Sequence, residues 1–211
     1  MSVYRGAVCK LCRRERRKLF LKGSRCLTAK CAIEKRDYPP GQHGRGRFRE
    51  SEYNLQLREK QKVKRTLFMT EKQFRRFYAI AEKMEGSTGE NLLINLERRL
   101  DNIVKRLGLA SGIQQARQLV LHRNIMVNGR VTNIPSYMVN EGDVIAVREK
   151  SRELEVIKSA LEENQSIGVP DWLTFDADKM TGEVNRFPTR DEITLAGGDI
   201  QENLIAELYS K

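Results

Sequence analysis

The prediction of the fold rests mainly on residues 97–148, which begin with Glu97-Arg98-Arg99-Leu100-Asp101-Asn102. Apolar side chains recur here at three- and four-residue steps, which places them on one helical face: Leu93, Leu96, Leu100, Ile103, Val104 and Leu107. Gly108 is expected to end this helix, because glycine enters the left-handed conformation without a steric cost. Ser111 is predicted to begin a second helix, with Gln114 as its capping-box partner. Its apolar face consists of Ile113, Ala116, Leu119 and Val120.

The period of the pattern changes after His122. Asn128-Gly129 separates Ile125-Met126-Val127 from Arg130-Val131-Thr132, and this pair is a strong hairpin signal because both turn residues tolerate positive φ. Residues 144–147 form one more predicted strand, after the turn residues 141–143. A helix pair followed by small antiparallel strands indicates an α+β fold.

This stretch resembles the α-L type of RNA-binding module. The resemblance rests on residues 99–102 (Arg-Leu-Asp-Asn), 115–120 (Gln-Ala-Arg-Gln-Leu-Val), 127–129 (Val-Asn-Gly) and 134–137 (Ile-Pro-Ser-Tyr). Several cations lie along it, and they can present a basic surface over a packed core: Arg99, Lys105, Arg106, Arg117, Arg123 and Arg130. The alternative is a small packing module whose arginines are ordinary surface charges.

Charge is distributed unevenly along the 211 residues, whose net charge is +11. Residues 1–65 hold 20 Lys and Arg against 6 Asp and Glu, a net +14, whereas residues 66–140 carry +5 and residues 141–211 carry −8. A one-ended excess of this size favours a polyanionic partner, because self-repulsion opposes compactness unless something neutralises it. The sequence has neither the ~18 consecutive apolar residues of a membrane span nor the apolar core of a signal peptide at its start. We therefore expect a protein of the reducing cytoplasm, with no membrane partner.

All 4 cysteines lie in this basic segment, as Cys9-x2-Cys12 and Cys26-x4-Cys31. The spacing is typical of one four-thiolate metal site. Disulfides would require an oxidising compartment, and free buried thiols would require a core that the segment lacks. We predict one zinc ion, whose binding would supply folding energy to the arm. An iron–sulfur cluster uses the same four ligands and remains the alternative cofactor.

Residues 35–50 follow the cysteines and are named the basic strap. The prolines of Tyr38-Pro39-Pro40 favour an extended backbone, and Gly41, Gly44 and Gly46 permit close approach to a partner. His43 is expected to contact RNA or solvent, because four thiolates already complete a tetrahedron. We interpret the strap as lying on phosphates; a disordered linker is the alternative.

The rest of the chain is predicted to be mostly helical. Thr70 with Gln73 is a capping box for a helix whose aromatic residues form a buried face, and Ser87 with Glu90 begins the next. A helix is expected around residues 154–161, strands at 172–175 and 183–187, and a short amphipathic helix at the end of the chain. Trp172 is interpreted as a core residue.

Taken together, these segments resemble the family of bacterial-type small-subunit ribosomal protein four, in its four-cysteine zinc-binding form. The resemblance covers nearly the whole chain and adds residues 8–14, 26–31, 38–44, 57–62, 147–152 and 208–210 to the module motifs. It implies a metal-binding arm at 1–45, a helical domain at 46–96 completed by 177–211, and an inserted α-L domain at 97–176.

The resemblance also implies a role. A member of this family is expected to bind small-subunit ribosomal RNA directly, to nucleate assembly of the subunit body, and to contribute to translational accuracy. Its expected partners are that RNA and other small-subunit proteins, notably protein five, with a functional link to protein twelve. Some relatives repress their own synthesis, which adds messenger RNA to the expected partners.

Charge and resemblance together give the candidate RNA-binding residues. They are Arg5, Lys10, Arg13, Arg14, Arg16, Arg17, Lys18, Lys22, Arg25, Lys30, Lys35, Arg36, His43, Arg45, Arg47, Arg49, Arg58, Lys62, Arg99, Arg117 and Arg123. The chain departs from the family pattern at Ile113, Gln114 and Val131, where relatives usually carry basic residues, so no RNA contact is assigned there. Arg123 is expected to compensate.

Two other classes of protein were weighed against this interpretation. An RNA-modifying or tRNA-charging enzyme would need a catalytic domain, yet the chain has only 2 His, no G-x-S-x-G motif and no P-loop. A zinc-containing DNA-binding regulator would need a helix aimed at base edges, and the Pro-Gly strap suits irregular RNA better. We therefore predict a structural RNA-binding protein and no enzymatic activity.

Overall fold

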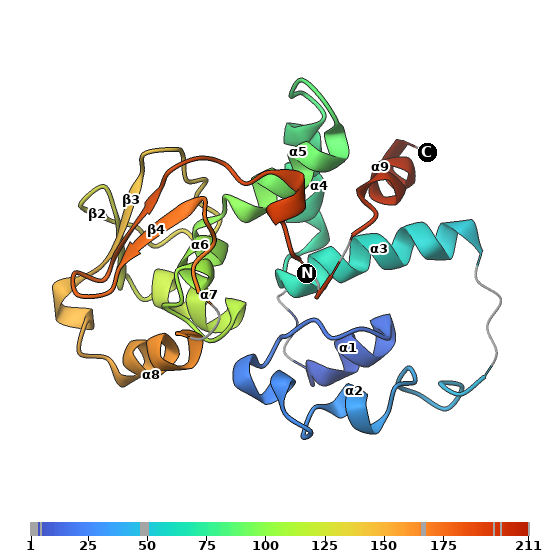
Figure 1. The fold of residues 1–211 in the computed structure, drawn as a ribbon. Helices are drawn as coiled ribbons and strands as arrows, with labels where there is room; N and C mark the ends of the chain where they lie inside the picture. Colours follow the sequence, from blue (N-terminus) through green and yellow to red (C-terminus); the bar gives the residue numbers. More distant parts are fainter. Residues whose placement is uncertain are drawn as a thin grey trace. The chain divides into compact units, whose positions relative to one another are not determined.

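The computed structural model of the protein describes residues 4, 6–46, 51–165, 168–195, 197–198 and 200–210. The chain forms two units: unit 1 comprises Met1–Leu93 and Thr194–Lys211, and unit 2 comprises Ile94–Ile193 (Figure 1). Residues 177–193 are predicted from the sequence to complete the helical domain. They lie in unit 2 instead, because strand β5 (Thr181–Val184) pairs with strands of that unit.

Unit 1 is helical. Its elements are α1 (Cys9–Glu15), the 3-10 helix η1 (Gly23–Leu27), α2 (Ala32–Lys35), α3 (Glu52–Thr66), α4 (Glu71–Ala81), the first part of α5 (Thr88–Glu97) and α9 (Glu202–Ser210). The predicted cap of α4 is confirmed, since the hydroxyl of Thr70 accepts a hydrogen bond from the backbone N–H of Gln73. The predicted C-terminal helix is present as α9, which packs against α3.

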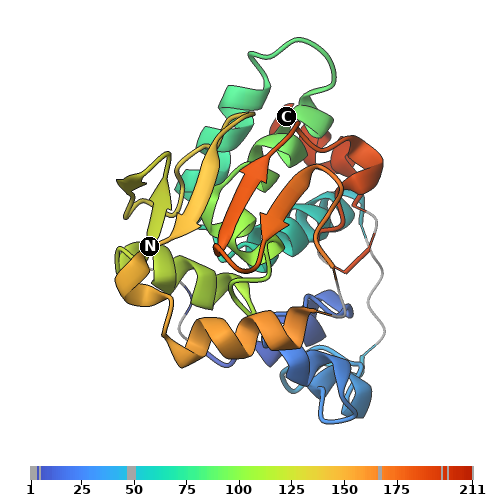
Figure 2. The same cartoon turned by 60° about the vertical axis from the view of Figure 1, so that its left-hand side comes forward.

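Unit 2 combines two short helices with a five-stranded antiparallel sheet of order β2-β1-β3-β5-β4. The elements are α6 (Leu100–Arg106), α7 (Ile113–Leu121), β1 (Ile125–Val127), β2 (Arg130–Val131), β3 (Val144–Val147), η2 (Glu149–Ser151), α8 (Glu155–Asn164), β4 (Leu173–Asp176), β5 and η3 (Arg190–Glu192). Figure 2 shows the sheet from its open side, with helices behind it. Helices plus a small antiparallel sheet confirm the predicted α+β class.

The hairpin predicted at Asn128-Gly129 is confirmed. Asn128 has φ 49° and Gly129 has φ 75°, and they connect β1 to β2 in an antiparallel pair. Gly108, with φ 79°, follows α6 as expected. The predicted Ser111–Gln114 capping box is wrong, because α7 begins only at Ile113. The side-chain oxygen of Gln115 instead accepts hydrogen bonds from both the backbone N–H and the hydroxyl of Ser111.

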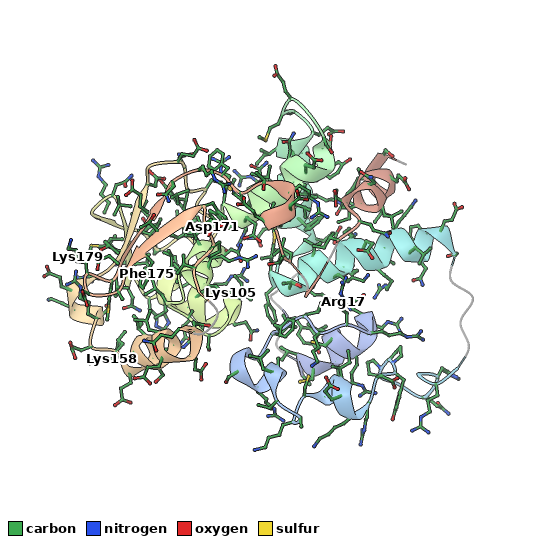
Figure 3. All side chains as sticks on the ribbon, in the orientation of Figure 1. Arg17, Lys105, Lys158, Asp171, Phe175 and Lys179 are labelled. Atoms are coloured by element: carbon green, nitrogen blue, oxygen red, sulfur yellow. The ribbon has the colours of Figure 1, made fainter. Side chains whose placement is uncertain are left out.

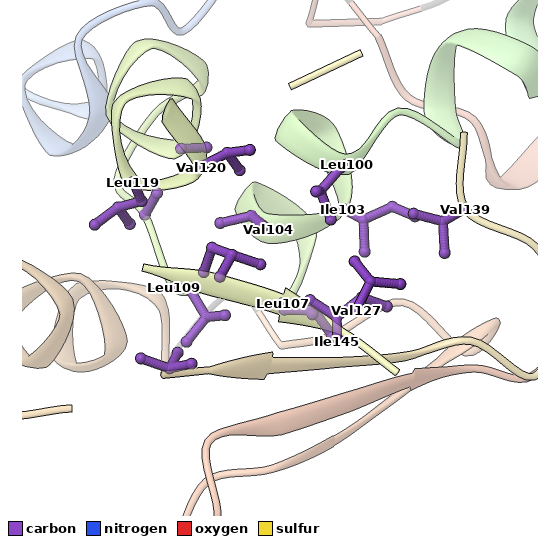
Figure 4. Close-up of a cluster of buried hydrophobic side chains, with 14 of the residues drawn as sticks. Leu100, Ile103, Val104, Leu107, Leu109, Leu119, Val120, Val127, Val139 and Ile145 are labelled. Carbon is purple, nitrogen blue, oxygen red and sulfur yellow. The ribbon is translucent and has the colours of Figure 1, made fainter. Parts of the chain in front are cut away.

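The apolar residues between positions 97 and 148 form most of the core of unit 2 (Figure 4). Leu100, Ile103 and Val104 of α6 lie fully buried against α7 and the inner face of the sheet, and Trp172 is buried among the same residues. The helical face predicted for residues 93–107 is divided between two helices. Residues Arg98-Arg99 interrupt it, because Val139 N–H donates to the carbonyl of Arg98 and Leu100 N–H donates to that of Tyr137.

A network of polar side chains joins three helices of unit 1. The carboxylate of Glu71 on α4 accepts hydrogen bonds from Lys60 (2.7 Å) and Lys64 (2.9 Å) on α3 and from the hydroxyl of Tyr209 (2.8 Å) on α9. Burial opposes ionisation of Glu71, yet these three hydrogen bonds outweigh it and lower the pKa of the carboxyl group from 4.5 to about 2.

Replacing Glu71 by Gln should therefore destabilise unit 1 at neutral pH. The folded-state pKa lies below the ordinary value, so the stabilisation is fully present above pH 4.5 and is lost as the pH falls towards about 2. Urea unfolding followed by circular dichroism should show a difference between wild type and Glu71→Gln that shrinks across this range. Glu82→Gln, at an exposed residue beyond the same helix, is the matched control. A difference that stays constant down to the lower end would contradict this role.

Candidate nucleic-acid interface

The four cysteines come together in unit 1. Cys9 and Cys12 belong to α1, Cys26 to η1, and Cys31 directly precedes α2. All four line one small cavity of about 10 Å³, together with Val8, Leu21, Lys22, Ala32 and Ile33. The thiols are not joined in disulfides. Residues separated by up to 22 positions in the sequence thus surround a single point, as a shared ligand would require.

The surroundings of these sulfurs are partly polar. The backbone N–H of Lys22 donates to Cys26 Sγ at 3.4 Å, and a backbone hydrogen bond from Leu19 reaches Cys12. Burial raises the pKa of the Cys12 and Cys26 thiols, and the other cysteines raise it further. In the described ranges, no group of three or more His, Cys, Asp or Glu side chains has the arrangement of an assembled metal site. The donor set and its N–H···S bonds fit a thiolate-bound cation, which would offset the cost of burying thiolates.

Most candidate cations of the arm are accessible to a partner. Eight of them are exposed: Lys10, Arg14, Arg16, Lys22, Arg25, Lys30, Lys35 and Arg36. Arg13, Arg17 and Lys18 are half-buried, and Lys18 forms an ion pair with Glu34 at 2.5 Å. Arg5, Arg47 and Arg49 lie outside the described residues. The arm therefore presents many cations around the cysteine cavity.

The strap is organised around Tyr38, whose importance the sequence analysis missed. The guanidinium groups of Arg13 and Arg45 lie 5.0 and 4.7 Å from the centre of its ring, and Arg13 Nε donates to its carbonyl oxygen at 3.0 Å. The chain turns tightly after Pro39, since a Cβ atom on Gly44 would lie 2.0 Å from the Pro39 carbonyl oxygen. His43 and Arg45 are exposed beyond this turn. In the sequence, the available signal was that Tyr38 lies between Arg36 and Arg45.

Arg58 and Lys62 on α3 are half-buried and paired with carboxylates. Arg58 contacts Glu15 of α1 at 3.0 Å, Arg65 forms a second ion pair with the same carboxylate, and Lys62 pairs with Glu59. Burial raises the pKa of Glu15, and the two arginines offset this only in part. The two ion pairs of Glu15 attach α1 to α3, so part of the predicted RNA-binding charge stabilises the fold.

Arg99 and Arg117 require a correction. Arg99 is 1% exposed, and its Nε and Nη2 donate to Asp101 at 3.0 and 2.7 Å. Arg117 on α7 binds the same carboxylate, with its Nη2 2.7 Å from Asp101 Oδ2. We name these three residues the Asp101 triad. Because two positive charges share a fully buried aspartate, the triad belongs to the interior of unit 2, and Arg99 is not placed to contact RNA.

Burial accounts for one of the three departures from the family pattern. Ile113 is buried in the interior, whereas Gln114, Val131 and Arg123 are exposed. Arg123 has φ 62° in the turn that follows α7. Among the candidate RNA-binding residues of unit 2, Arg123 is the exposed one, and Arg130 nearby is exposed as well.

These features define a class: a structural nucleic-acid-binding protein with a basic, cysteine-containing arm on a helical unit and a second unit of helix pair and small sheet. No helix among the described residues is long and apolar enough to cross a membrane. Comparison with known families then gives two matches. The Ribosomal protein S4/S9 N-terminal domain matches residues 3–97, and the S4 domain matches residues 98–145.

Relatives match over the full length. The small ribosomal subunit proteins uS4 of Halothermothrix orenii, Trichlorobacter lovleyi and Pelotomaculum thermopropionicum are each 54% identical to this chain over 211 residues, which is 100% of both chains. The chain belongs to the uS4 family of small ribosomal subunit proteins. It is therefore a ribosomal structural protein and not an enzyme, which excludes the enzyme class weighed above.

Proposed function

We propose that this protein binds small-subunit ribosomal RNA directly, nucleates assembly of the body of the small subunit, and contributes to translational accuracy. Its place is in the small ribosomal subunit of the cytoplasm. The observation that carries the RNA-binding role is the exposed charge of the arm, where eight candidate cations are accessible to phosphates. Nucleation and accuracy rest on membership of the uS4 family together with this direct mode of binding.

The proposed partners follow from the same role. The RNA is the first partner, and small-subunit proteins, notably protein five, are the next. Protein twelve is proposed as a functional partner in accuracy, and messenger RNA as a second RNA ligand. The proposed RNA contacts are the candidate residues of the arm and strap with Arg123, whereas the Asp101 triad stabilises unit 2.

We further propose that Cys9, Cys12, Cys26 and Cys31 hold one zinc ion. Support comes from their shared cavity and from the backbone N–H of Lys22 directed at Cys26 Sγ. When bound, zinc would supply folding energy to an arm with few apolar residues to bury. The basic side chains nearby would offset the negative charge of four thiolates. An iron–sulfur cluster on the same cysteines is the alternative.

Native mass spectrometry of the purified protein should detect one zinc ion, which acid releases. Cys12→Ser should lose it, and Leu27→Ala, at an exposed neighbour of Cys26, should keep it. A brown protein that absorbs visible light would replace zinc by an iron–sulfur cluster. Metal-free wild-type protein with all four thiols open to titration would contradict the metal site.

Salt dependence of RNA binding tests the role of the arm. If roughly six to ten phosphate contacts form, affinity should fall about 10³- to 10⁵-fold between 50 and 200 mM salt. Replacing the exposed residues Lys22, Arg25 and Lys30 by Ala should flatten the slope of log affinity against log salt by roughly two to three units. Preference for the ribosomal RNA over scrambled RNA should persist, because shape is read by the folded surface.

The matched control removes equal charge from unit 2, as Lys150→Ala, Lys158→Ala and Lys179→Ala (Lys158 and Lys179 are labelled in Figure 3). Filter binding should show little change in its salt slope. Wild-type protein with no preference for ribosomal RNA would refute the proposed function. An unchanged slope in the arm variant would refute the assignment of phosphate contacts to the arm.

A further inference from the structure

A cavity of about 400 Å³ lies within unit 1, beside the cysteine arm and separate from the thiols. The end of α1, the strap and the first turns of α3 form its walls, with Arg14, Arg16, Pro39, Leu55, Arg58 and Lys62 among the lining residues. Its volume is within the range of pockets that take small organic ligands, about 300–1,000 Å³. It is therefore large enough for one nucleotide.

The lining combines apolar surface with four cations and with the carboxylates of Glu15 and Glu59. Pro39 and Leu55 are the apolar residues, and Leu55 is 42% exposed on α3. Arg14 and Arg16 are exposed and form no ion pair with a described carboxylate, whereas Arg58 and Lys62 are paired with Glu15 and Glu59. An apolar surface beside unengaged guanidinium groups suits a ligand with a flat ring and a phosphate.

The wall of the cavity between α1 and α3 contains buried polar atoms that lack hydrogen-bond partners in the described part of the chain. Three of its polar atoms are buried without a hydrogen-bond partner among the described residues: Glu15 Oε2, Glu59 Oε2 and Arg58 Nε. Native proteins pair most such groups, because an unpaired buried polar atom destabilises the fold. Ion pairs of Glu15 with Arg58 and Arg65 hold the two helices at this wall. Because these three atoms have almost no accessible surface, they belong to the packed wall and not to the surface that a ligand in the cavity would contact.

We propose that this cavity captures a single unstacked nucleotide of the bound RNA. The base would lie against Pro39 and Leu55, and its phosphate beside Arg14 and Arg16. RNA recognition commonly uses nucleotides that have left the stack, because their faces and edges are then open to side chains. The inference rests on the proposed RNA-binding function and adds a site of base recognition to a surface otherwise described by its charge.

Filling the cavity tests the proposal in the full-length protein. Leu55→Trp should weaken binding of the ribosomal RNA roughly 10- to 100-fold, the range for one stacked base. Its salt slope should not change, because no phosphate contact is removed. Tyr53→Trp, at an exposed position two residues away that does not line the cavity, is the size-matched control and should bind as wild type. Leu55→Glu, controlled by Tyr53→Glu, repeats the test with a charge that repels phosphate.

Arg16→Ala should in contrast flatten the salt slope by about 0.7–0.9 units, as expected for one lost phosphate contact. Circular dichroism melting should show that all variants remain folded. The proposal is overturned if both Leu55 variants bind as tightly as their Tyr53 controls while wild-type protein still prefers ribosomal RNA. Loss of that preference in the wild type would instead refute the proposed function, so the two failures are distinguishable.

Discussion

Leu100→Asp should leave unit 2 unfolded. Leu100 is 0% exposed and lies between Ile103, Val104 and the sheet (Figure 4). The substitution removes buried apolar surface and places a carboxylate within a cluster of apolar side chains, at a cost of at least several kcal/mol. Domains are stable by only about 5–15 kcal/mol, so this loss is a large share of the total. We expect no folded population of unit 2 at 37 °C.

The chain offers a direct measurement of this effect. Its single tryptophan, Trp172, is buried in the core of unit 2, so its fluorescence should shift to the emission of a solvated indole in Leu100→Asp. Leu121→Asp makes the same change at a residue of α7 that is 52% exposed, and it should keep the wild-type spectrum. A native Trp172 spectrum and melting temperature in Leu100→Asp would show that the core has been placed incorrectly.

Asp101→Ala should destabilise unit 2 by about 3–5 kcal/mol, the range for breaking a buried ion pair. Asp101 is fully buried and accepts hydrogen bonds from both Arg99 and Arg117. Without it, Arg99 and Arg117 both lose the buried carboxylate that they share. Chemical unfolding monitored through Trp172 should show the loss as a lower denaturant midpoint with little change in slope.

A compensated variant separates charge from packing. Replacing all three residues of the Asp101 triad by apolar residues of similar size, as Asp101→Leu, Arg99→Met and Arg117→Met, should recover much of the stability, because apolar replacements of buried ion pairs are often neutral or stabilising. Asp178→Ala removes an exposed aspartate from the same unit and is the control. If Asp101→Ala were as stable as Asp178→Ala, the triad would contribute nothing to unit 2.

Features that depend on local backbone geometry and on residue spacing were predictable from the sequence alone. Asn128-Gly129 specifies a hairpin because few other pairs adopt positive φ twice in succession, and Thr70 caps α4 because its hydroxyl reaches a backbone N–H three residues away. The basic arm and the close spacing of the four cysteines can be recognised from the positions of these residues in the sequence alone. The apolar period of residues 93–107 identified the core of unit 2 for the same reason.

Features that depend on contacts between residues distant in the sequence became apparent only from the tertiary structure. The helical period continues through Arg98-Arg99, yet the helix ends there because residues 137–139 supply competing backbone hydrogen bonds. Thr181 and Gly182 lie before the strand predicted at residues 183–187, yet they belong to β5 because β3 and β4 pair with it on both sides. Arg99 and Arg117 have the charge that RNA binding requires. Asp101 holds both in the interior, since a buried carboxylate needs compensating cations and the packing of α6 against α7 places these two beside it.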